Sequence, residues 1–180
     1  MGGSRVFVES FPIPPRLIIF GATDFARARV AAGKLLGYRT ALCDAREGFA
    51  TRARFPEVDE LIVEQPFRYL ASTTTDARTA ICVLAHDSKF DVPLLEVALR
   101  GPAGYIGALG SRRTHEDWLR RLRVAGLSKS EIAKLKSPIG LDLGASTPQE
   151  TAVSILAEVI SSKHATSGRP LTAATGPIHP

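Results

Sequence analysis

The first glycine-containing turn of the chain has residue types that could bind a phosphate group. The stretch GATDFA matches the dinucleotide-binding pattern G-x-G-x-x-G/A at Gly21 and Ala26, but Thr23 occupies the middle glycine position. A β-branched side chain there hinders close approach of a pyrophosphate to the backbone. Asp24 adds a carboxylate that can cap the amides of the following helix and repel a phosphate. We therefore expect this turn to be self-capped.

The segment GALGSRRTHED offers a second site for an anion. Gly107 and Gly110 allow a tight exit from a strand, and Ser111 can donate a hydrogen bond. Arg112 and Arg113 add guanidinium groups whose geometry suits phosphate or pterin oxygens. Because this loop keeps the glycines that the first turn lacks, we predict that an anion binds here. The alternative is a surface helix start with solvated arginines.

An acidic residue follows the second apolar run. Asp44 lies 23 residues after Gly21, where a carboxylate would hydrogen-bond a ribose diol. This position favours NAD over NADP, whose extra phosphate Asp44 would repel, although neighbouring Arg46 weakens the preference. The alternative is that Asp44 pairs with Arg46 or caps the following turn.

Two further polar residues, His86 and Asp87, follow the fourth apolar run. The imidazole could hydrogen-bond a ligand or act as an acid or base, and the alternative is a structural role. No partner spacing makes His86 a metal ligand or a triad member, so we predict neither a metal site nor a catalytic residue. For Asp142 we favour turn capping.

The elements that position these residues alternate between short apolar runs and stretches of helical period, as in repeated βαβ units. This alternation predicts a Rossmann-like, doubly wound parallel α/β sheet of about six strands with helices on both faces. Ligands bind such sheets beyond the carboxyl ends of the strands, where strand order reverses between the first and fourth strands. The predicted strands cover residues 16–20, 40–44, 60–64, 80–85 and 105–109, with a sixth at 139–141.

Apolar periodicity and capping patterns predict the helices. Hydroxyl-x-x-acid arrangements indicate helix starts at Thr114, Ser128 and Thr147, the last with Pro148 at the first helical position. The predicted buried stripes are Phe25, Ala28, Ala32 and Leu35; Leu94, Leu95, Ala98 and Leu99; Trp118, Leu122 and Ala125; and Ala152, Leu156, Val159 and Ile160.

Length and composition indicate one globular domain. The chain has 180 residues, 44% hydrophobic and 23% charged, with a formal net charge of +5 that would suit an anionic ligand. We expect a lead-in over residues 1–15, a Rossmann-like domain over 16–163 and a tail over 164–180 that has little to form a core.

The remaining sequence features concern compartment and partners. Cys43 and Cys82 lie inside apolar runs, which fits buried thiols in a reduced compartment. No stretch approaches the ~18 apolar residues of a membrane span, and prolines interrupt the first 15 residues. We therefore predict a cytoplasmic protein without a membrane partner. Arg120, Arg121 and Arg123 fit a solvated face better than a nucleic-acid site, since no recognised module accompanies them.

Two long segments carry a resemblance to a known family. The stretches YIGALGSRRTHEDWLRRLRVAGLS and SPIGLDLGASTPQETAVSILAEVI resemble the C-terminal Rossmann-like domain of the XdhC/CoxI family, accessory factors of molybdenum hydroxylases such as xanthine dehydrogenase. VFVESFPIPPRLIIFGATDFARA, CDAREGFATRARFPEVDE and VLAHDSKFDVPLLEVAL are similar to other landmarks of that domain, so the likeness covers roughly residues 5–162.

The resemblance implies a maturation role, in which molybdenum cofactor (molybdopterin) is held for delivery to a molybdenum hydroxylase apoenzyme and catalysis belongs to that client. Members commonly carry a preceding domain, whereas only about 15 residues precede the first predicted strand. Either the chain is a truncated or split member whose partner is a separate polypeptide, or it binds a ligand on the Rossmann-like domain alone. The positions carried over are Gly21 and Ala22, Asp44 and Arg46, His86 and Asp87, and Gly110, Ser111, Arg112 and Arg113.

Three functions stay open at this point. The first is a non-catalytic accessory factor whose crevice accepts a nucleotide-like or pterin-like anion. The second is an NAD(P)-dependent oxidoreductase, against which Thr23 and Asp24 count. The third is a structural protein–protein interaction module. A homodimer is a further expected assembly, since a lone Rossmann-like domain often pairs with a second copy.

Overall fold

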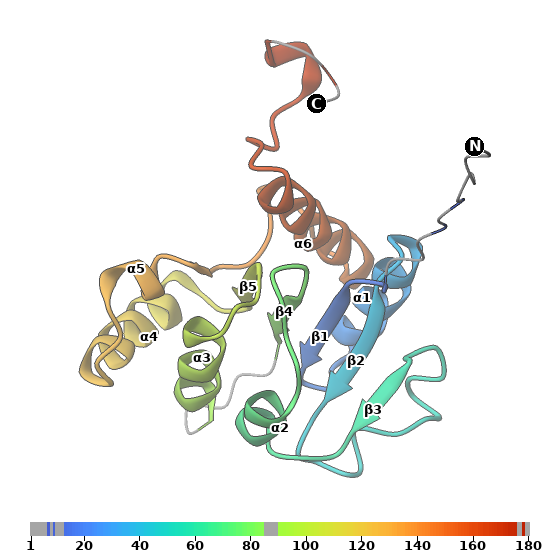
Figure 1. Cartoon of the computed structure of the whole chain (residues 1–180), viewed down its shortest axis with the longest axis vertical. Coiled ribbons are helices and arrows are strands. Elements are labelled where there is room, and N and C mark those ends of the chain that lie inside the picture. Colours follow the sequence, from blue (N-terminus) through green and yellow to red (C-terminus); the bar gives the residue numbers. More distant parts are fainter. Residues whose placement is uncertain (1–6, 8, 10–12, 85–89, 176–177, 179–180) are drawn as a thin grey trace, which may run out of the picture.

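The chain forms a six-stranded parallel sheet over the residues that the computed structural model describes, namely 7, 9, 13–84, 90–175 and 178. The strand order is β3-β2-β1-β4-β5-β6, and each neighbouring pair is parallel (Figure 1). The order reverses between β1 and β4, which confirms the predicted doubly wound, Rossmann-like fold. The strands are β1 (Arg16–Phe20), β2 (Arg39–Cys43), β3 (Glu60–Ile62), β4 (Ala80–Val83), β5 (Tyr105–Ala108) and β6 (Leu135–Lys136).

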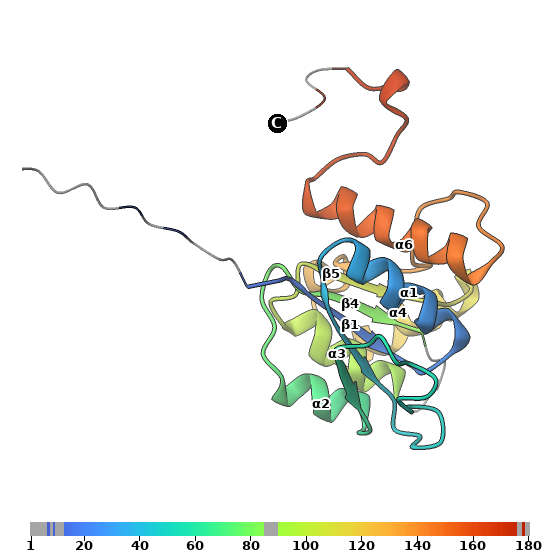
Figure 2. The same ribbon diagram turned by 90° about the vertical axis from the view of Figure 1, so that its right-hand side faces the viewer.

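Helices cover both faces of this sheet. Two of them, α1 and α6, pack together on one face, and the remaining α-helices pack on the other (Figure 2). The helices are α1 (Asp24–Leu35), α2 (Pro66–Ser72), α3 (Asp91–Arg100), α4 (Arg112–Val124), α5 (Lys129–Ile132) and α6 (Pro148–Lys163).

The central strands are buried on both sides. In β1, Leu17 and Ile19 join the core under α1 and α6, whereas Ile18 and Phe20 join the core under α2, α3 and α4. All four side chains are 0% exposed. Successive side chains of a strand point to opposite faces, so a strand between two helix layers must be apolar throughout. This requirement explains the uninterrupted run LIIF.

The capping patterns set two helix starts as predicted. Ser128 with Glu131 forms a complete capping box at α5, and Thr147 with Glu150 forms another at α6. The prediction that a helix begins at Thr114 was wrong. Helix α4 begins two residues earlier because the Ser111 hydroxyl serves as its N-cap and accepts a hydrogen bond from the Thr114 amide at 3.1 Å.

Two predicted buried faces differ from the observed ones. On α1, Leu35 is 87% exposed, and the buried face consists of Ala26, Arg29, Val30 and Gly33. Gly33 lies on β1 and β2, where an added Cβ would come within 2.5 Å of a Leu17 methyl group, so this position of the face favours glycine. The α3 stripe is confirmed. On α6 the buried residues include Ile155 instead of Ile160, which is 43% exposed.

The sixth strand also lies elsewhere than predicted. It consists of Leu135 and Lys136, because these residues pair with Ile106 and Gly107 of β5. The predicted segment 139–141 turns toward α6 instead, and the Gly140 amide donates to Glu158 Oε2 at 2.8 Å. Gly107 is not part of a strand exit. It lies inside β5, where an added Cβ would come within 2.4 Å of the Ile139 side chain.

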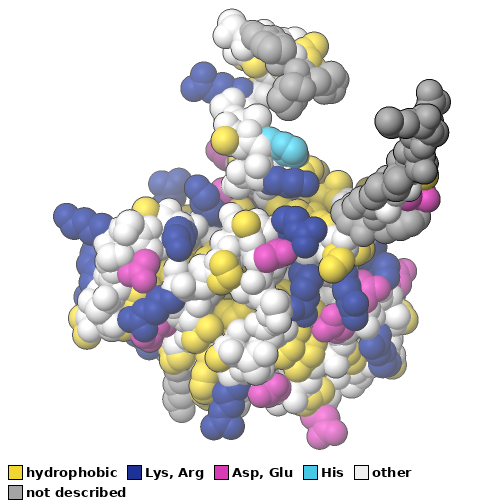
Figure 3. Space-filling model, viewed as in Figure 1, with side chains coloured by type: hydrophobic (Ala, Val, Ile, Leu, Met, Phe, Trp, Pro, Cys, Tyr) yellow, Lys and Arg dark blue, Asp and Glu magenta, His cyan; other side chains and the backbone are white. Residues whose placement is uncertain are grey.

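The outer surface carries charges of both signs. Figure 3 shows Lys and Arg side chains spread among Asp and Glu over one face of the molecule. On α4, Arg120 and Arg121 both pair with Asp117, which is typical of a solvated helix face. No helix among the described residues is long and apolar enough to cross a membrane. After α6 the chain continues as an exposed segment with one short 3-10 helix (Leu171–Ala173) (Figure 2).

Candidate functional site

A cleft of about 470 Å³ opens at the carboxyl ends of β1, β2 and β4. This is the switch point of the sheet, where doubly wound folds bind ligands. The volume falls within the range of about 300–1,000 Å³ that is typical of small-molecule sites. Of the predicted site residues, Gly21, Asp44 and Arg46 line it, and Ala22 lies directly behind Gly21 with 1% exposure.

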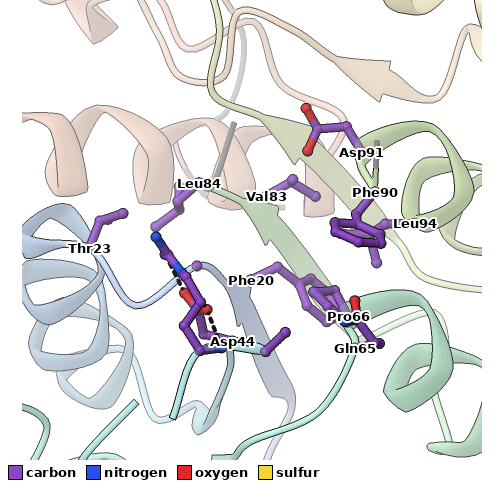
Figure 4. A pocket seen from close by; sticks show the side chains of 13 residues that line it. Phe20, Thr23, Asp44, Gln65, Pro66, Val83, Leu84, Phe90, Asp91 and Leu94 are labelled. Atoms are coloured by element: carbon purple, nitrogen blue, oxygen red, sulfur yellow. Dashed lines mark hydrogen bonds and ion pairs between the residues drawn. The ribbon is translucent and has the colours of Figure 1, made fainter. Parts of the chain in front are cut away.

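The carboxylate of Asp44 is held by three groups at the edge of this cleft. Oδ2 accepts the Ala22 amide at 2.8 Å and Arg46 Nη2 at 2.7 Å. Oδ1 accepts the Arg46 amide and Arg46 Nε, each at 2.9 Å. Asp44 is 4% exposed, so these bonds satisfy a buried charge. The geometry matches the alternative in which Asp44 pairs with Arg46. Figure 4 shows Asp44 on one side of the cleft.

The pKa of Asp44 lies below its ordinary value for the same reason. Burial alone raises this pKa, but the hydrogen bonds from the Arg46 side chain and from the Ala22 and Arg46 amides more than offset that effect. Asp44 is therefore ionised at neutral pH. The Arg46 guanidinium also lies over the Phe49 ring, 4.2 Å from its centroid, which holds this arginine at the rim.

The start of α1 is not self-capped, contrary to prediction. Its N-cap is Thr23, whose side chain makes no capping hydrogen bond, although Thr23 lines the cleft. Within the described part of the chain its buried Oγ1 has no hydrogen-bond partner. The Asp24 side chain is 93% exposed and pairs with Arg54 at 3.3 Å instead of capping the helix. The first-turn amides of α1 thus lack a side-chain cap, as an anion site at a helix start requires.

The opposite side of the cleft is largely apolar and was missed by sequence reasoning. Phe20, Pro66, Phe90 and Leu94 line it (Figure 4). Two polar side chains interrupt this wall, and each belongs to the start of a helix that follows a strand. They are Gln65, the N-cap residue of α2, and Asp91, the first residue of α3. Their positions after β3 and β4 are the signal that could have identified them.

The second predicted anion loop does not contribute to the described lining of this cleft. Gly110, Ser111, Arg112 and Arg113 are absent from the described residues that form it, and the last three are exposed. The Ser111 hydroxyl contacts Thr114 as a cap. The role of this loop in binding an anion stays a prediction. His86 and Asp87 lie outside the described residues.

The residue types of the cleft suit an anion and a planar ring better than a metal ion. Within the described residues, no group of three His, Cys, Asp or Glu side chains could hold a metal. Both cysteines are buried, and burial raises the pKa of each thiol to about 12, so neither supplies a thiolate. For molybdopterin, the residues present therefore fit the pterin and the phosphate but offer molybdenum no thiolate ligand.

The sheet order, the cleft at the switch point and the glycine turn beside it define a Rossmann-type domain. Residues 17–159 match the XdhC Rossmann domain, and the chain belongs to this family. The resemblance seen in the sequence is thereby confirmed.

Three proteins illustrate the range of relatives. The chain is 33% identical over 167 residues to an uncharacterised Escherichia coli protein, YqeB, covering 93% of this chain and 31% of YqeB. It is 30% identical to a probable xanthine dehydrogenase subunit of Bacillus subtilis, covering 89% of this chain and 46% of that protein. It is 31% identical to the E. coli molybdenum cofactor insertion chaperone PaoD, covering 81% of this chain and 39% of PaoD.

A solved structure extends the comparison to the fold. The crystal structure of a xanthine dehydrogenase from Bacillus halodurans superposes with a TM-score of 0.72 at 29% identity, covering 89% of this chain and 45% of that chain. The chain thus spans less than half the length of these curated and structural relatives.

Proposed function

We propose that this protein is a non-catalytic accessory factor in the maturation of a molybdenum hydroxylase of the xanthine dehydrogenase type. In this proposal the cleft at the switch point binds an anionic ligand with a pterin-like or nucleotide-like ring, and a molybdenum hydroxylase apoenzyme is the partner that receives it. The names of two relatives, a molybdenum cofactor insertion chaperone and a probable component of a xanthine dehydrogenase, support the role.

The observation that carries the ligand proposal is the uncapped start of α1 beside a glycine turn in a cleft of suitable size. Gly21 has φ of 107°, a conformation that favours glycine and turns the chain sharply from β1 toward α1. Thr23 Oγ1, which has no hydrogen-bond partner among the described residues, can bond a phosphate oxygen, and the guanidinium of Arg46 lies at the rim in its ion pair with Asp44. Asp44 contributes to this site indirectly, because its hydrogen bonds hold the Ala22 amide of the turn and the Arg46 side chain in place.

When bound, molybdenum cofactor would supply the redox chemistry of the client enzyme. The residues of this chain would hold its phosphate at the start of α1 and its ring against the apolar wall. We propose no proton transfer or bond breaking by this chain. Because Cys43 and Cys82 are free and buried, the proposal places this role in the reducing cytoplasm, and a second copy of the chain is a proposed further partner.

Calorimetry of the purified chain with a molybdopterin nucleotide, NAD, NADP and inorganic phosphate tests this proposal. We expect the molybdopterin nucleotide to bind most tightly and to raise thermal stability, by ~2.7 kcal/mol near 100 times its dissociation constant. Preferential binding of NAD or NADP together with hydride transfer to an aldehyde or alcohol would establish the oxidoreductase alternative. Binding of none of these ligands would favour a structural interaction module.

A substitution at the rim locates the site. Arg46→Met should weaken binding of the molybdopterin nucleotide by about tenfold or more, because a charge-assisted hydrogen bond contributes roughly 1.5–3 kcal/mol. Arg123→Met, a change at an exposed arginine on α4, is the control for loss of charge and should leave the affinity unchanged. Urea denaturation of Arg46→Met shows whether loss of the partner of Asp44 has also changed the stability of the fold. Equal affinities of the two variants would exclude the rim of this cleft as the anion site.

A further inference from the structure

The positive charge of the chain is concentrated in one segment. Residues 112–136, which include α4, α5 and β6, contain eight Lys and Arg against three Asp and Glu, an excess of five. This excess equals the formal net charge of the whole chain, so the remaining residues contain equal numbers of cationic and acidic side chains, 15 of each. In Figure 3, Lys and Arg side chains project from the side of the molecule that α4 and α5 form in Figure 1. An excess confined to one segment gives this part of the surface a positive potential.

Helix α4 directs its share of this charge to one side. Trp118 and Leu122 are 1% and 0% exposed and attach the helix to the core. At 3.6 residues per turn, four arginines fall within an arc of about 100° on the opposite side of the helix. All four are exposed, and we call them the arginine face: Arg112, Arg113, Arg120 and Arg123.

The arginine face contributes little to the stability of the fold. Arg112, Arg113 and Arg123 make no ion pair with a described residue, and Arg120 pairs with Asp117 on the same helix. Arg112 and Arg113 occupy the first turn of α4, where the helix dipole disfavours a positive charge, and that turn contains no acidic residue. A partner that brings negative charge would supply the favourable contacts that the protein itself does not provide.

The composition of the helix favours an acidic protein over a nucleic acid or a membrane as this partner. Glu116 lies within the same arc and Asp117 at its margin, where both would repel the continuous phosphate chain of a nucleic acid. A protein surface can instead place cationic groups opposite these carboxylates and acidic groups opposite the arginines. Helices that bind a membrane surface combine basic residues with exposed aromatic and apolar side chains. On α4 the aromatic Trp118 is buried, and Val124 is the one large apolar side chain that is exposed.

The arginine face begins at the edge of the sheet where the cleft opens. Because α4 follows β5, its first turn lies beyond the carboxyl end of β5, and the neighbouring strand β4 contributes Val83 to the cleft. Helix α3, which contributes Leu94 to the cleft, packs against α4. A protein bound to the arginine face therefore lies beside the mouth of the cleft, in position to receive a ligand from it.

We propose that the arginine face of α4 is the docking surface for an acidic surface of the molybdenum hydroxylase apoenzyme. This inference rests on the proposed function, because that function supplies the partner. It adds the surface that binds the partner and the electrostatic basis of their encounter. Opposite charges increase the rate of association, and salt screens them, so docking should be fast at low ionic strength and strongly dependent on salt.

Biolayer interferometry of the full chain with a xanthine dehydrogenase apoenzyme, prepared without molybdenum cofactor, tests this surface. The double variant Arg112→Gln and Arg113→Gln should lower the association rate constant by about tenfold or more at about 50 mM NaCl. Its stability in urea should equal or exceed that of wild type, because both arginines oppose the helix dipole. Since the assay contains no cofactor, its result does not depend on which helix start binds the anion of the ligand.

A matched double variant separates this surface from net charge. Arg27→Gln with Arg68→Gln removes two exposed arginines from α1 and α2 and lowers the net charge by the same amount. Its association rate constant should stay within about twofold of wild type. An equal loss of rate in the two double variants would overturn the proposal, because net charge alone would then explain the effect.

Further outcomes distinguish the partners that a basic surface can have. Tighter binding of duplex DNA or of phosphatidylserine vesicles than of the apoenzyme, lost in Arg112→Gln with Arg113→Gln, would overturn the proposal and assign the arginine face to that partner. Self-association in light scattering, lost in the same variant, would assign the face to a second copy of the chain. Binding of the apoenzyme that this variant leaves unchanged would overturn the docking surface and leave the proposed function in place. No binding of the apoenzyme by wild type would overturn both.

Discussion

Arg46 holds the carboxylate of Asp44 through two bonds, Nε to Oδ1 at 2.9 Å and Nη2 to Oδ2 at 2.7 Å. The same carboxylate accepts the Ala22 amide at 2.8 Å, so one buried charge ties the end of β2 to the turn after β1. A ribose diol would have to displace Arg46 to reach Asp44. The structure thus gives Asp44 a structural contact, and its role toward a ribose stays a prediction.

Asp44→Asn should therefore destabilise the fold. The asparagine cannot accept all four hydrogen bonds, and the buried Ala22 amide loses a charged acceptor, so we expect the free energy of unfolding at pH 7 to fall by about 1–3 kcal/mol. Urea denaturation measures this change, with Asp142→Asn as the exposed control, for which we expect a change within about 0.5 kcal/mol. Equal stability of the two variants would show that the pair contributes little.

A second carboxylate gives the fold a dependence on acid pH. Asp59 accepts hydrogen bonds from Lys34 Nζ at 2.7 Å and from the Thr40 amide and hydroxyl at 2.8 and 2.9 Å. The bond from Lys34, followed by that from the Thr40 amide, lowers the pKa of Asp59 to about 2. Because the folded pKa lies below the unfolded value of about 3.9, this contribution is present above pH ~4 and is lost as the pH falls toward 2.

Asp59→Asn should remove this pH dependence. Wild type should be more stable than the variant at pH 7, and the difference should shrink between pH 4 and pH 2. Urea denaturation across this range provides the measurement. The Asp59 side chain is 32% exposed and its lysine partner 42% exposed, so 0.5 M NaCl should reduce part of the difference. A difference that stays constant with pH would contradict the assignment.

A buried arginine on the inner side of α1 is expected to lower the stability of the fold, whereas the two carboxylates raise it. Arg29 is 0% exposed, and its Nη1 donates to the Phe25 carbonyl at 2.6 Å. Within the described residues, Nε and Nη2 have no hydrogen-bond partner, and burial lowers the pKa of this group. Burying a charge with incomplete hydrogen bonding is costly, and replacing it with an apolar side chain of similar length is often neutral or favourable.

Arg29→Met should therefore keep or raise the free energy of unfolding, by up to about 1 kcal/mol. Arg27→Met, on the exposed face of the same helix, is the control and should change stability by less than about 0.5 kcal/mol. A loss of more than about 2 kcal/mol in Arg29→Met would mean that the guanidinium makes a favourable interaction that its hydrogen bonds do not reveal.

The sequence specified the sheet more fully than the helix faces. The run around Phe20 predicts a strand because a strand covered on both sides must be continuously apolar. The face of α1 was harder to predict, since Leu35 is apolar yet exposed and the buried positions include Arg29 and Gly33. Close approach to β1 favours glycine at position 33, and this depends on how helix and sheet pack rather than on periodicity. The two-residue β6 carries too short a signal to identify.

The site was predictable only in part. The rule that ligands bind at strand ends identified Gly21 and Asp44 correctly as residues beside the cleft. The rule could not reveal that the Asp44 carboxylate is paired with Arg46. A ribose contact and a local ion pair require the same residue type at the same position. Gln65 and Asp91 were missed because they follow different strands and reach one cleft only through the fold.

The two helix starts at α1 and α4 differ in how they can receive an anion. At α1 the amides lack a side-chain cap, and the exposed Asp24 places a negative charge in the first turn, opposing any bound anion. Asp24→Asn should strengthen binding of the molybdopterin nucleotide by about two- to fivefold at low salt, and screening should reduce the gain at 0.5 M NaCl.

At α4 the Ser111 hydroxyl already occupies the Thr114 amide, so an anion there would depend chiefly on Arg112 and Arg113. The double change Arg112→Ala and Arg113→Ala should then leave the affinity nearly unchanged if the cleft is the site. The same titration compares the variants. A large loss in the double variant without a gain in Asp24→Asn would assign the anion to the loop after β5, as the glycine pattern of the sequence predicts. A gain in Asp24→Asn alone would assign it to α1, because only there does removal of the carboxylate lower the repulsion.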